Sequence, residues 1–464
     1  MSPNVQPRLP ELLRINSLPG QERPSADGAG EVSRSATPAI DALALTTIPV
    51  GTLPFGVAVA ANGNAYVTNF GSNGVTVIDT ATDLVVGTPI PVGTSPFGAT
   101  VAANGNAYVT NYNSSNVTVI DTATNLVVGT PIPVGSNPSG VAVAANGNAY
   151  VTNVNSNDVT VIDTATNLVV VPSIPVGTGP FGVAIAPNGN AYVTNFGSND
   201  VTVINTATNM VVGTPIPVGT HPLGVAVAPT GKAYVTNEGS NDVTVIDTAT
   251  NLVVVPSIPV GGSPSGVAVA PTGKAYITNQ GSNDVTVIDT ATNLVVVPSI
   301  PVGTGPYGVA VAPNGKIYVA NIDSNDVSVL PPFPMLAGIN PTSGASTGGT
   351  VVTITGTNLA GASVTVGGSP ATGVSVNAGG TQISATTPAG APGPATVTVT
   401  TAGGSASLVN AFTYLAAPTL AGISPIEGPA AGGTVVTITG TNLAGASVTV
   451  GGSPATGVSV NAGG

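Results

Sequence analysis

A repeat of 42 residues, marked by seven tyrosines, constrains this chain more than any other feature. Each tyrosine opens a Tyr-(Val/Ile)-(Thr/Ala)-Asn tetrapeptide. The tyrosines are Tyr66, Tyr108, Tyr150, Tyr192, Tyr234, Tyr276 and Tyr318. A fixed period of about 40 residues made of short strands is typical of a β-propeller with one repeat per blade. The period predicts the fold, whereas function has to be sought in the loops.

Each repeat contains four strand-like segments separated by turn residues. In the fourth repeat they are 182–186, 191–195, 201–204 and 210–218, and Asn-Gly separates the first two. Asn-Gly is typical of a two-residue hairpin turn. The prolines of the array fall almost entirely in the fourth segment and the loops. Proline cannot donate to a sheet's hydrogen bonds, so the fourth segment is expected at the outer edge. We predict four antiparallel strands per blade.

The ends of the repeat array predict how the ring closes. The last repeat stops after its third strand, at 327–330, whereas residues 42–50 align with a fourth strand, 252–260. The N-terminal strand is therefore expected to complete the last blade and to remove an unpaired edge. We predict an all-β chain with a seven-bladed β-propeller over residues 42–330.

The composition changes on both sides of the array. Residues 1–41 are polar and rich in Pro and Ser, and we expect a disordered tail. A Pro-rich linker, 331–334, leads to alternating strands with frequent Gly turns, which predict immunoglobulin-like β-sandwich modules at 335–415 and 418–464. Segments 350–380 and 434–464 are identical, but the second module lacks a counterpart of 381–415. We interpret it as truncated, with completion by another chain as the alternative.

Composition also removes several function classes. The chain has no cysteine and one histidine, so thiolate chemistry, histidine acid–base catalysis and multi-histidine metal sites are not expected. The net charge is −12 and all four arginines precede residue 42, which argues against nucleic acid and anionic membranes as partners. No apolar run is long enough to span a bilayer. We expect no catalytic residue, metal or cofactor, no membrane insertion and a monomeric propeller.

Three repeated motifs carry a family resemblance. They are Pro-x-Gly-Val-Ala-Val-Ala, Asn-Gly-x-Ala-Tyr-Val-Thr-Asn and Val-Thr-Val-Ile-Asp-Thr-Ala-Thr-Asn. With them the array resembles the YVTN-repeat family of bacterial and archaeal surface-layer-type and YncE-like proteins. Residues 335–415, with their Val-Thr-Ile-Thr-Gly-Thr-Asn-Leu segment, resemble an IPT/TIG domain. The resemblance implies an extracellular or cell-surface binding protein, although the chain shows no recognisable signal peptide.

Differences among the seven repeats point to a candidate binding surface. Variation concentrates in the loop that enters the first strand and in the residue that follows the Tyr-Val-Thr-Asn box. In a four-stranded meander these two connections emerge on the same side, which we call the variable face. One-sided exposed aromatic residues suit a ligand platform, including one for sugar rings. The candidate ligand-binding residues are Phe55, Phe70, Phe97, Tyr112, Phe181, Phe196, His221, Glu238, Gln280 and Tyr307.

Each candidate also has a purely structural interpretation. The phenylalanines can pack between blades, and the lone His221 can be incidental. Aspartates recur at both ends of the third strand, where calcium binding is conceivable but turn capping is the simpler expectation. The repeated tyrosines are expected to serve packing.

Two function classes remain open, with a third that is hard to exclude. The first is a non-enzymatic surface binding or adhesion protein that uses the propeller as platform for an unknown protein or carbohydrate and the sandwiches as stalk. The second is an enzyme of the propeller lactonase or lyase type, which needs converging His, Glu, Asp, Asn or Arg. The array has no arginine, one histidine and one glutamate, which favours binding. The third is a purely structural surface-layer-type repeat protein.

Overall fold

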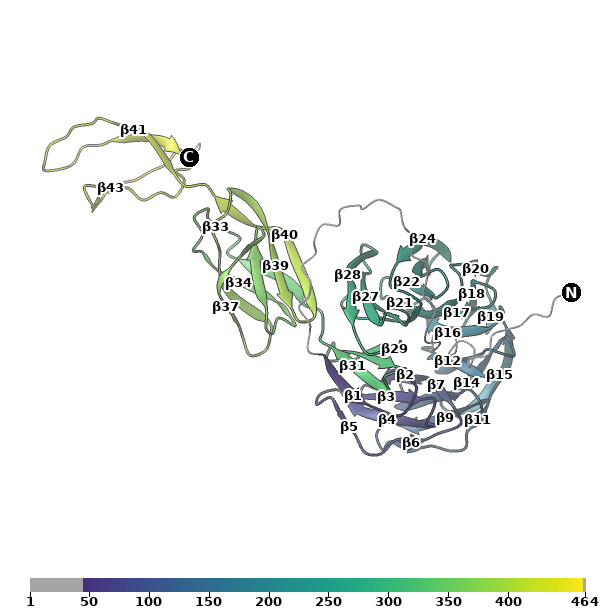
Figure 1. The fold of residues 1–464 in the computed structure, drawn as a ribbon. Helices are drawn as coiled ribbons and strands as arrows, with labels where there is room; N and C mark the ends of the chain where they lie inside the picture. Colours follow the sequence, from purple (N-terminus) through teal and green to yellow (C-terminus); the bar gives the residue numbers. More distant parts are fainter. Residues whose placement is uncertain (1–44, 462–464) are drawn as a thin grey trace, which may run out of the picture. The chain divides into compact units, whose positions relative to one another are not determined.

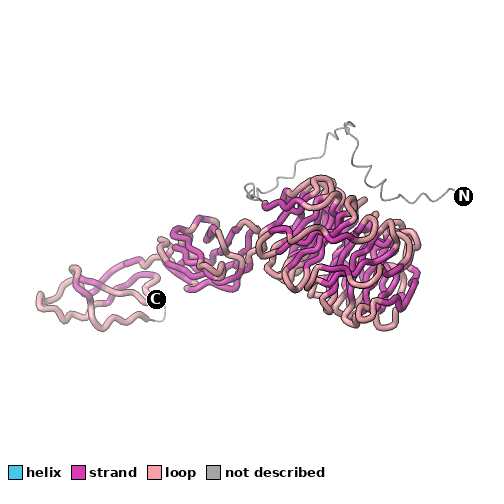
Figure 2. The backbone as a smooth tube through the Cα atoms, turned by 90° about the horizontal axis from the view of Figure 1, so that it is seen from below, coloured by secondary structure: helices cyan, strands magenta, loops and turns pink. Residues whose placement is uncertain are grey.

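The computed structural model describes residues 45–461, so the predicted tail at 1–41 lies outside the described residues. Every regular element of the described part is a strand (Figure 2). Within 45–461 there is accordingly no helix long and apolar enough to cross a bilayer. The chain divides after Pro332 into two compact units.

Seven antiparallel sheets form the first unit and surround a common centre (Figure 1). Each sheet contains four consecutive strand positions, numbered here from the centre outwards. The first strands are β2 (Pro54–Val59), β7 (Pro96–Val101), β12 (Pro138–Val143), β16 (Pro180–Ile185), β21 (Pro222–Val227), β25 (Pro264–Val269) and β29 (Pro306–Val311). The second strands are β3 (Asn64–Asn69), β8 (Asn106–Asn111), β13 (Asn148–Asn153), β17 (Asn190–Asn195), β22 (Lys232–Asn237), β26 (Lys274–Asn279) and β30 (Ile317–Asn321).

The outer half of each blade completes this pattern. The third strands are β4 (Gly74–Asp79), β9 (Asn116–Asp121), β14 (Asp158–Asp163), β18 (Asp200–Asn205), β23 (Asp242–Asp247), β27 (Asp284–Asp289) and β31 (Asp326–Leu330). The fourth strands are continuous in β15 (Leu168–Pro175), β24 (Leu252–Pro259) and β28 (Leu294–Pro301). They are split in the pairs β5 (Leu84–Val85) and β6 (Ile90–Pro91), β10 (Leu126–Val127) and β11 (Ile132–Pro133), and β19 (Met210–Val211) and β20 (Ile216–Pro217).

A glycine explains why three outer strands are split. Gly87, Gly129 and Gly213 adopt positive φ angles between the two short pieces. The corresponding residue of the continuous strands is a valine, which disfavours that conformation. The local sequence therefore decides between the two forms of the outer strand.

The ring closes as the sequence predicts. β1 (Thr46–Pro49) pairs antiparallel with β31, with Ile48 opposite Val327, and supplies the fourth strand of the last blade. At the inner end of the same seam, the Pro-x-Gly glycine of the last blade, Gly308, lies against the carbonyl oxygen of Phe55. The three-plus-one closure is thus confirmed.

The inner turns differ from the predicted two-residue hairpin. In the fourth blade the loop between the first two strands spans 186–189, and Gly189 takes the positive φ. The Asn188 side chain donates to the carbonyl of Thr248 in the next blade at 2.6 Å. The two-residue prediction was wrong because a type I′ turn needs a positive φ at both residues, and here Gly189 has one but Asn188 does not.

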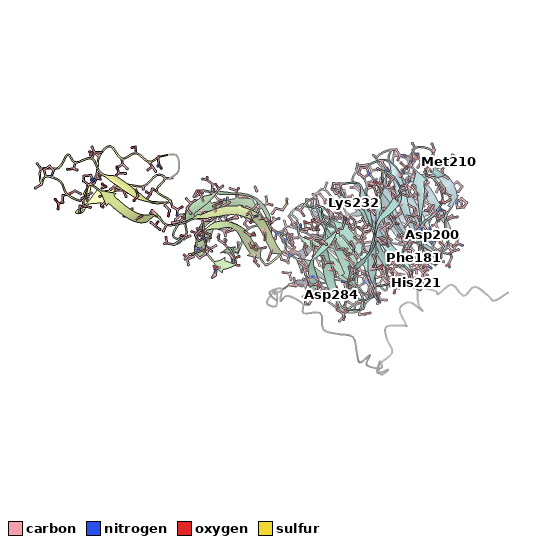
Figure 3. The ribbon with its side chains drawn as sticks, turned by 90° about the horizontal axis from the view of Figure 1, so that it is seen from above. Phe181, Asp200, Met210, His221, Lys232 and Asp284 are labelled. Atoms are coloured by element: carbon pink, nitrogen blue, oxygen red, sulfur yellow. The ribbon has the colours of Figure 1, made fainter. Side chains whose placement is uncertain are left out.

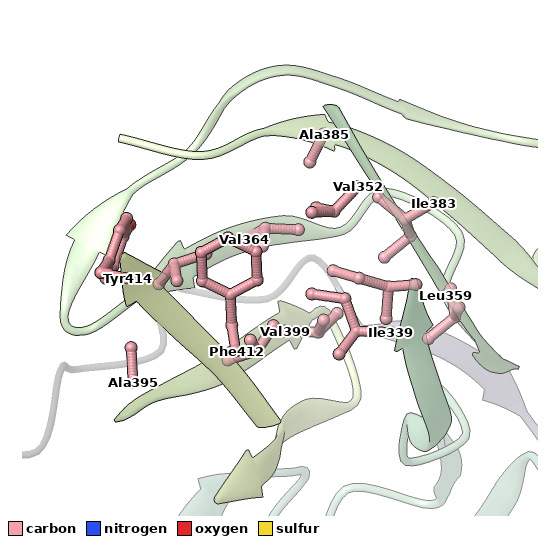
Figure 4. Packing of buried hydrophobic residues seen from close by; sticks show 13 residues of the cluster. Ile339, Val352, Leu359, Val364, Ile383, Ala385, Ala395, Val399, Phe412 and Tyr414 are labelled. Atoms are coloured by element: carbon pink, nitrogen blue, oxygen red, sulfur yellow. The ribbon is translucent and has the colours of Figure 1, made fainter. Parts of the chain in front are cut away.

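The second unit contains a complete immunoglobulin-like sandwich and a partial copy. One sheet has the order β32 (Met335–Asn340), β34 (Val351–Thr357), β38 (Gln382–Thr386), β37 (Thr372–Val376). The other has the order β33 (Ser343–Ala345), β40 (Gly404–Leu415), β39 (Gly393–Thr401), β35 (Ser363–Val366), β36 (Ser369–Pro370). Phe412, Val352 and Ile383 are among the residues that fill the core between them (Figure 4).

Two short hairpins make up the regular structure of the second copy over its described residues, 418–461. They pair β41 (Thr419–Ser424) with β42 (Thr437–Thr441) and β43 (Thr449–Val450) with β44 (Ser453–Pro454). Val366 of the first module is 1% exposed, whereas its counterpart Val450 is 58% exposed. In the first module the strands within 381–415 cover this residue, and among the described residues 418–461 nothing covers its counterpart.

Candidate functional site

The first-strand aromatic residues meet at the centre of the ring. Phe55 lies 4.7 Å from Phe97 and 4.9 Å from Tyr307, measured between ring centroids. Phe97 also lies 6.0 Å from Phe181 and 5.8 Å from Tyr307. These residues come from the first, second, fourth and seventh blades. Rings from blades that are not neighbours can touch only if the side chains point towards the axis.

The residue after each Tyr-Val-Thr-Asn box forms a second layer around this centre. Phe70 contacts Phe55 and Phe97, Phe196 contacts Phe181, and Tyr112 contacts Phe97. Together they form the axial cluster, whose buried and partly buried members are Leu53, Phe55, Phe70, Phe97, Tyr112, Val154, Phe181, Phe196, Leu223, Tyr307 and Ile322.

The expectation of exposed aromatic residues was wrong. Phe55, Phe97, Tyr112, Phe181 and Phe196 are only 3–6% exposed. Close approach of the inner strands explains this burial: a side chain on Gly56 would stand 2.5 Å from the Phe97 carbonyl oxygen. Strands held this close bring their axial side chains into contact with one another. Of the predicted aromatic residues, Phe70 and Tyr307 remain partly exposed.

The polar candidates lie beside the axial cluster. His221 is exposed and stacks on Phe196, with ring centroids 4.4 Å apart and planes 12° apart. Glu238 and Gln280 are partly buried. Each follows the Tyr-(Val/Ile)-Thr-Asn box of its blade, a position at which the other blades have apolar residues of the axial cluster. Figure 3 shows Phe181 and His221 towards one rim of the propeller and Lys232 towards the other.

Burial perturbs the titratable groups of the variable face. Loss of solvent raises the pKa of the Glu238 carboxyl, because the charged form is disfavoured there. Burial also raises the pKa of Tyr112 to about 12. The pKa of Tyr307 is raised further, first by burial and then by the charge of Glu238 and by Tyr112. These interactions indicate that Glu238 and the two phenols share one environment.

Asparagines outside the predicted set position the variable loops. The residue that enters each first strand has a positive φ in every blade, including φ 53° at His221 and φ 50° at Leu53. Such a conformation is costly for residues with a Cβ atom. The Asn199 side-chain oxygen accepts a hydrogen bond from the backbone amide of His221 at 2.8 Å. The Asn325 side chain does the same for the amide of Leu53, between the last blade and the first. The Ser-Asn pair that recurs before the third strand is the sequence pattern from which these loop-positioning asparagines could have been found.

The opposite side, which we call the constant face, is built from repeated hydrogen bonds. Tyr192 donates to the carbonyl of Thr248 at 3.1 Å and to the Asn251 side chain, both in the next blade. Tyr66 and Tyr108 make the same pair of contacts. The prediction that the repeated tyrosines serve packing is confirmed, because their rings are buried between blades.

The aspartates cap turns and bond to neighbouring strands of their own blade. The Asp163 carboxylate accepts a hydrogen bond from the backbone amide of Ala165 at 2.8 Å. Asp121 and Asp247 likewise accept a hydrogen bond from the amide two residues later in the chain. At the other end of the strand, Asp158 accepts hydrogen bonds from Asn153 and Ser173. The turn-capping expectation is confirmed. Across residues 45–461, no three His, Cys, Asp or Glu side chains are grouped so that they could hold a metal ion.

Comparison with known families agrees with this architecture. The model of the virginiamycin B lyase family matches residues 41–330, more than half of the chain. The chain belongs to the virginiamycin B lyase family. The IPT/TIG domain model matches 334–414 and 418–464 of this family member. The finer likeness to YVTN-repeat surface-layer proteins stays a prediction. No curated protein matches the chain.

Solved structures similar to this family member share the propeller. Hydrazine synthase from Kuenenia stuttgartiensis is 25% identical, with a TM-score of 0.55, covering 65% of this chain and 99% of that one. A streptogramin B lyase is 17% identical, with a TM-score of 0.54, covering 61% and 96%. Virginiamycin B lyase from Staphylococcus aureus is 16% identical, with a TM-score of 0.54, covering 61% and 98%. At 16–17% identity the two lyases show the fold alone.

Proposed function

We propose that this protein is a non-enzymatic, secreted or cell-surface binding protein that uses the variable face of its propeller to hold a ligand. The main support for this proposal is the position of the residues that differ among the seven repeats. In every blade but the sixth, at least one residue at these variable positions belongs to or packs against one axial cluster. The IPT/TIG modules would act as a stalk, with an unknown protein or carbohydrate as partner.

The contrast within the blade supports a ligand role. On the constant face, each residue type recurs because a directional hydrogen bond to the next blade requires it. On the variable face, seven equivalent positions carry aromatic, aliphatic, acidic and amide side chains. Exposed His221 and partly buried Glu238, Gln280 and Phe70 give this face a mixed apolar and polar surface. Ligand sites commonly combine apolar walls with a few polar groups.

Carbohydrate arrays test the proposal. The full chain should bind a subset of glycans or cell-wall polysaccharides, and a His221→Ala/Gln280→Ala variant should lose that binding. These two residues are better choices than Tyr112 or Phe196, whose burial makes their removal a test of folding. Leu294→Ala is the matched control, because Leu294 is 64% exposed at the outer edge of a blade. Equal binding by the double variant would contradict the proposal.

Family membership favours one alternative function. Another solved virginiamycin B lyase is a catalytically inactive histidine-to-alanine variant with quinupristin. His221 is the one histidine of this chain. Its backbone carbonyl accepts a hydrogen bond from the backbone amide of Glu238 at 3.0 Å. Mass spectrometry of quinupristin incubated with the protein tests this lyase alternative. A new product that disappears in His221→Ala would establish an enzyme and overturn the binding-only proposal.

A further inference from the structure

Glu238 occupies a position that is apolar in most other blades. The equivalent residues after the Tyr-Val-Thr-Asn box are Phe70, Tyr112, Val154, Phe196, Glu238, Gln280 and Ile322. Five of them belong to or pack against the axial cluster. The repeat therefore directs the Glu238 carboxylate towards aromatic rings. The Glu238 amide donates to the carbonyl of His221 at 3.0 Å, and the His221 ring stacks on Phe196, so Glu238 lies beside this aromatic pair. In keeping with this placement, the charge of Glu238 contributes to raising the pKa of Tyr307.

No lysine or arginine of the described propeller lies on this face. Its three lysines begin second strands, or directly precede one, at the constant face, and Lys274 and Lys316 pair there with Asp289 and Asp83. Within residues 45–461, no side chain donates a hydrogen bond or ion pair to the Glu238 carboxylate. A carboxylate taken out of water without a partner is costly, so it will favour any cation that reaches it.

The surroundings suit an organic cation better than a metal ion. Calcium takes six to eight oxygen ligands, whereas Glu238 is a single carboxylate in a mainly apolar cluster. The faces of aromatic rings attract alkylammonium groups, and such cages recognise quaternary ammonium ligands. Beside this position the exposed His221 stacks on Phe196, and Tyr307 and Glu238 itself are partly exposed residues.

We propose that the Glu238 carboxylate and the neighbouring rings of the axial cluster bind an alkylammonium group of the ligand. The inference rests on the proposed function, because it assigns the chemistry of the ligand that the variable face would hold. Coulomb attraction to Glu238 and cation–π contact with the rings would act on the same group. The acidic net charge of −12 would favour the approach of such a ligand.

Comparing choline with its neutral isostere 3,3-dimethylbutan-1-ol tests whether the charge of the ligand, rather than its shape, determines binding. Binding to the full chain is measured by calorimetry or by NMR titration at pH 7 and low ionic strength. Choline should bind at least about fivefold more tightly than the alcohol, as expected for a cation over aromatic rings next to a carboxylate. Glu238→Gln should remove that preference. The variant should fold, because Gln280 occupies the equivalent position in the next blade.

Asp163→Asn is the matched charge control. Asp163 caps a turn on the constant face, and Asn205 serves the same role in the next blade. This variant should bind choline like the unmodified protein. Equal binding of choline and the alcohol, or unchanged choline binding by Glu238→Gln, would overturn the inference. If glycans still bind in a His221-dependent way, the proposed function survives that result; if no probe binds, both fail.

Discussion

On the constant face, the tyrosine of one blade donates to the turn of the next, and the same bond recurs around the ring. On the variable face, neighbouring blades meet through aromatic and aliphatic side chains that differ at every step. A hydrogen bond needs a matched donor and acceptor, so the constant face admits few substitutions. Apolar contact is not directional, so the variable face tolerates many combinations of similar volume.

The closing seam, where the last blade meets the first, differs in one residue from the other blade contacts of the constant face. Asp83 stands where other blades have asparagine, and it accepts a hydrogen bond from Tyr318 at 2.6 Å. Lys316 adds an ion pair to the same carboxylate at 2.7 Å. The hydrogen-bond geometry of the other seams is preserved while a charge pair is added. The constant face therefore preserves the bond rather than the residue.

The largest expected effect comes from emptying the axial cluster. Phe97→Ala removes a buried ring that contacts Phe55, Phe181 and Tyr307. The cavity should cost about 3–5 kcal/mol of the free energy of unfolding. Urea unfolding followed by circular dichroism measures it. A loss well under about 1 kcal/mol would show that the axial cluster does not stabilise the ring.

Removing one hydroxyl of the constant face should cost less. Tyr192→Phe keeps the buried ring but leaves the Asn251 side-chain oxygen without this donor, while the Thr248 carbonyl keeps its hydrogen bond from Asn188. A loss of about 1–3 kcal/mol is expected from such an unsatisfied group. The same urea experiment measures it, with Tyr112→Phe as control, because no hydrogen bond from the Tyr112 hydroxyl is present in the described part of the chain. Equal effects of the two variants would contradict the role of the repeated hydroxyl.

Glu238→Gln should stabilise the protein in a pH-dependent way. Burial raises the pKa of Glu238 in the folded protein, so folding favours its protonated form. The stability of the unmodified protein should rise as the pH falls from 7 towards the unfolded pKa, about 4.3. The variant should be the more stable protein at pH 7, and the difference should vanish below about pH 4. A difference that is the same at both pH values would argue against the buried carboxylate.

The closing-seam charge pair should have the smallest effect. Asp83→Asn restores the residue of most other blades and removes the partner of Lys316, which is partly exposed. The expected loss is under about 1 kcal/mol and should shrink in high salt. Unfolding midpoints at low and high salt measure it. A salt-independent loss above about 2 kcal/mol would mean that closure depends on more than a screened ion pair.

The sequence by itself determined the propeller, its closure and the turn-capping aspartates. The period of 42 residues and the displaced fourth strand at residues 46–49 leave one pairing that avoids an exposed edge. The capping aspartates were predictable for a similar reason, because each acts within three residues of its own position. Local patterns of this kind are visible in the chain without any knowledge of long-range contacts.

Only the tertiary structure decided whether the variable face is open or filled. Phe97 and Phe181 are 84 residues apart, and nothing in either repeat shows that their rings touch across the axis. That contact depends on how closely Pro-x-Gly glycines let the inner strands approach, which is a property of the closed ring. The placement of Glu238 beside those rings follows from the same closure. Burial at an axis is a collective result of all the blades, so no single repeat encodes it.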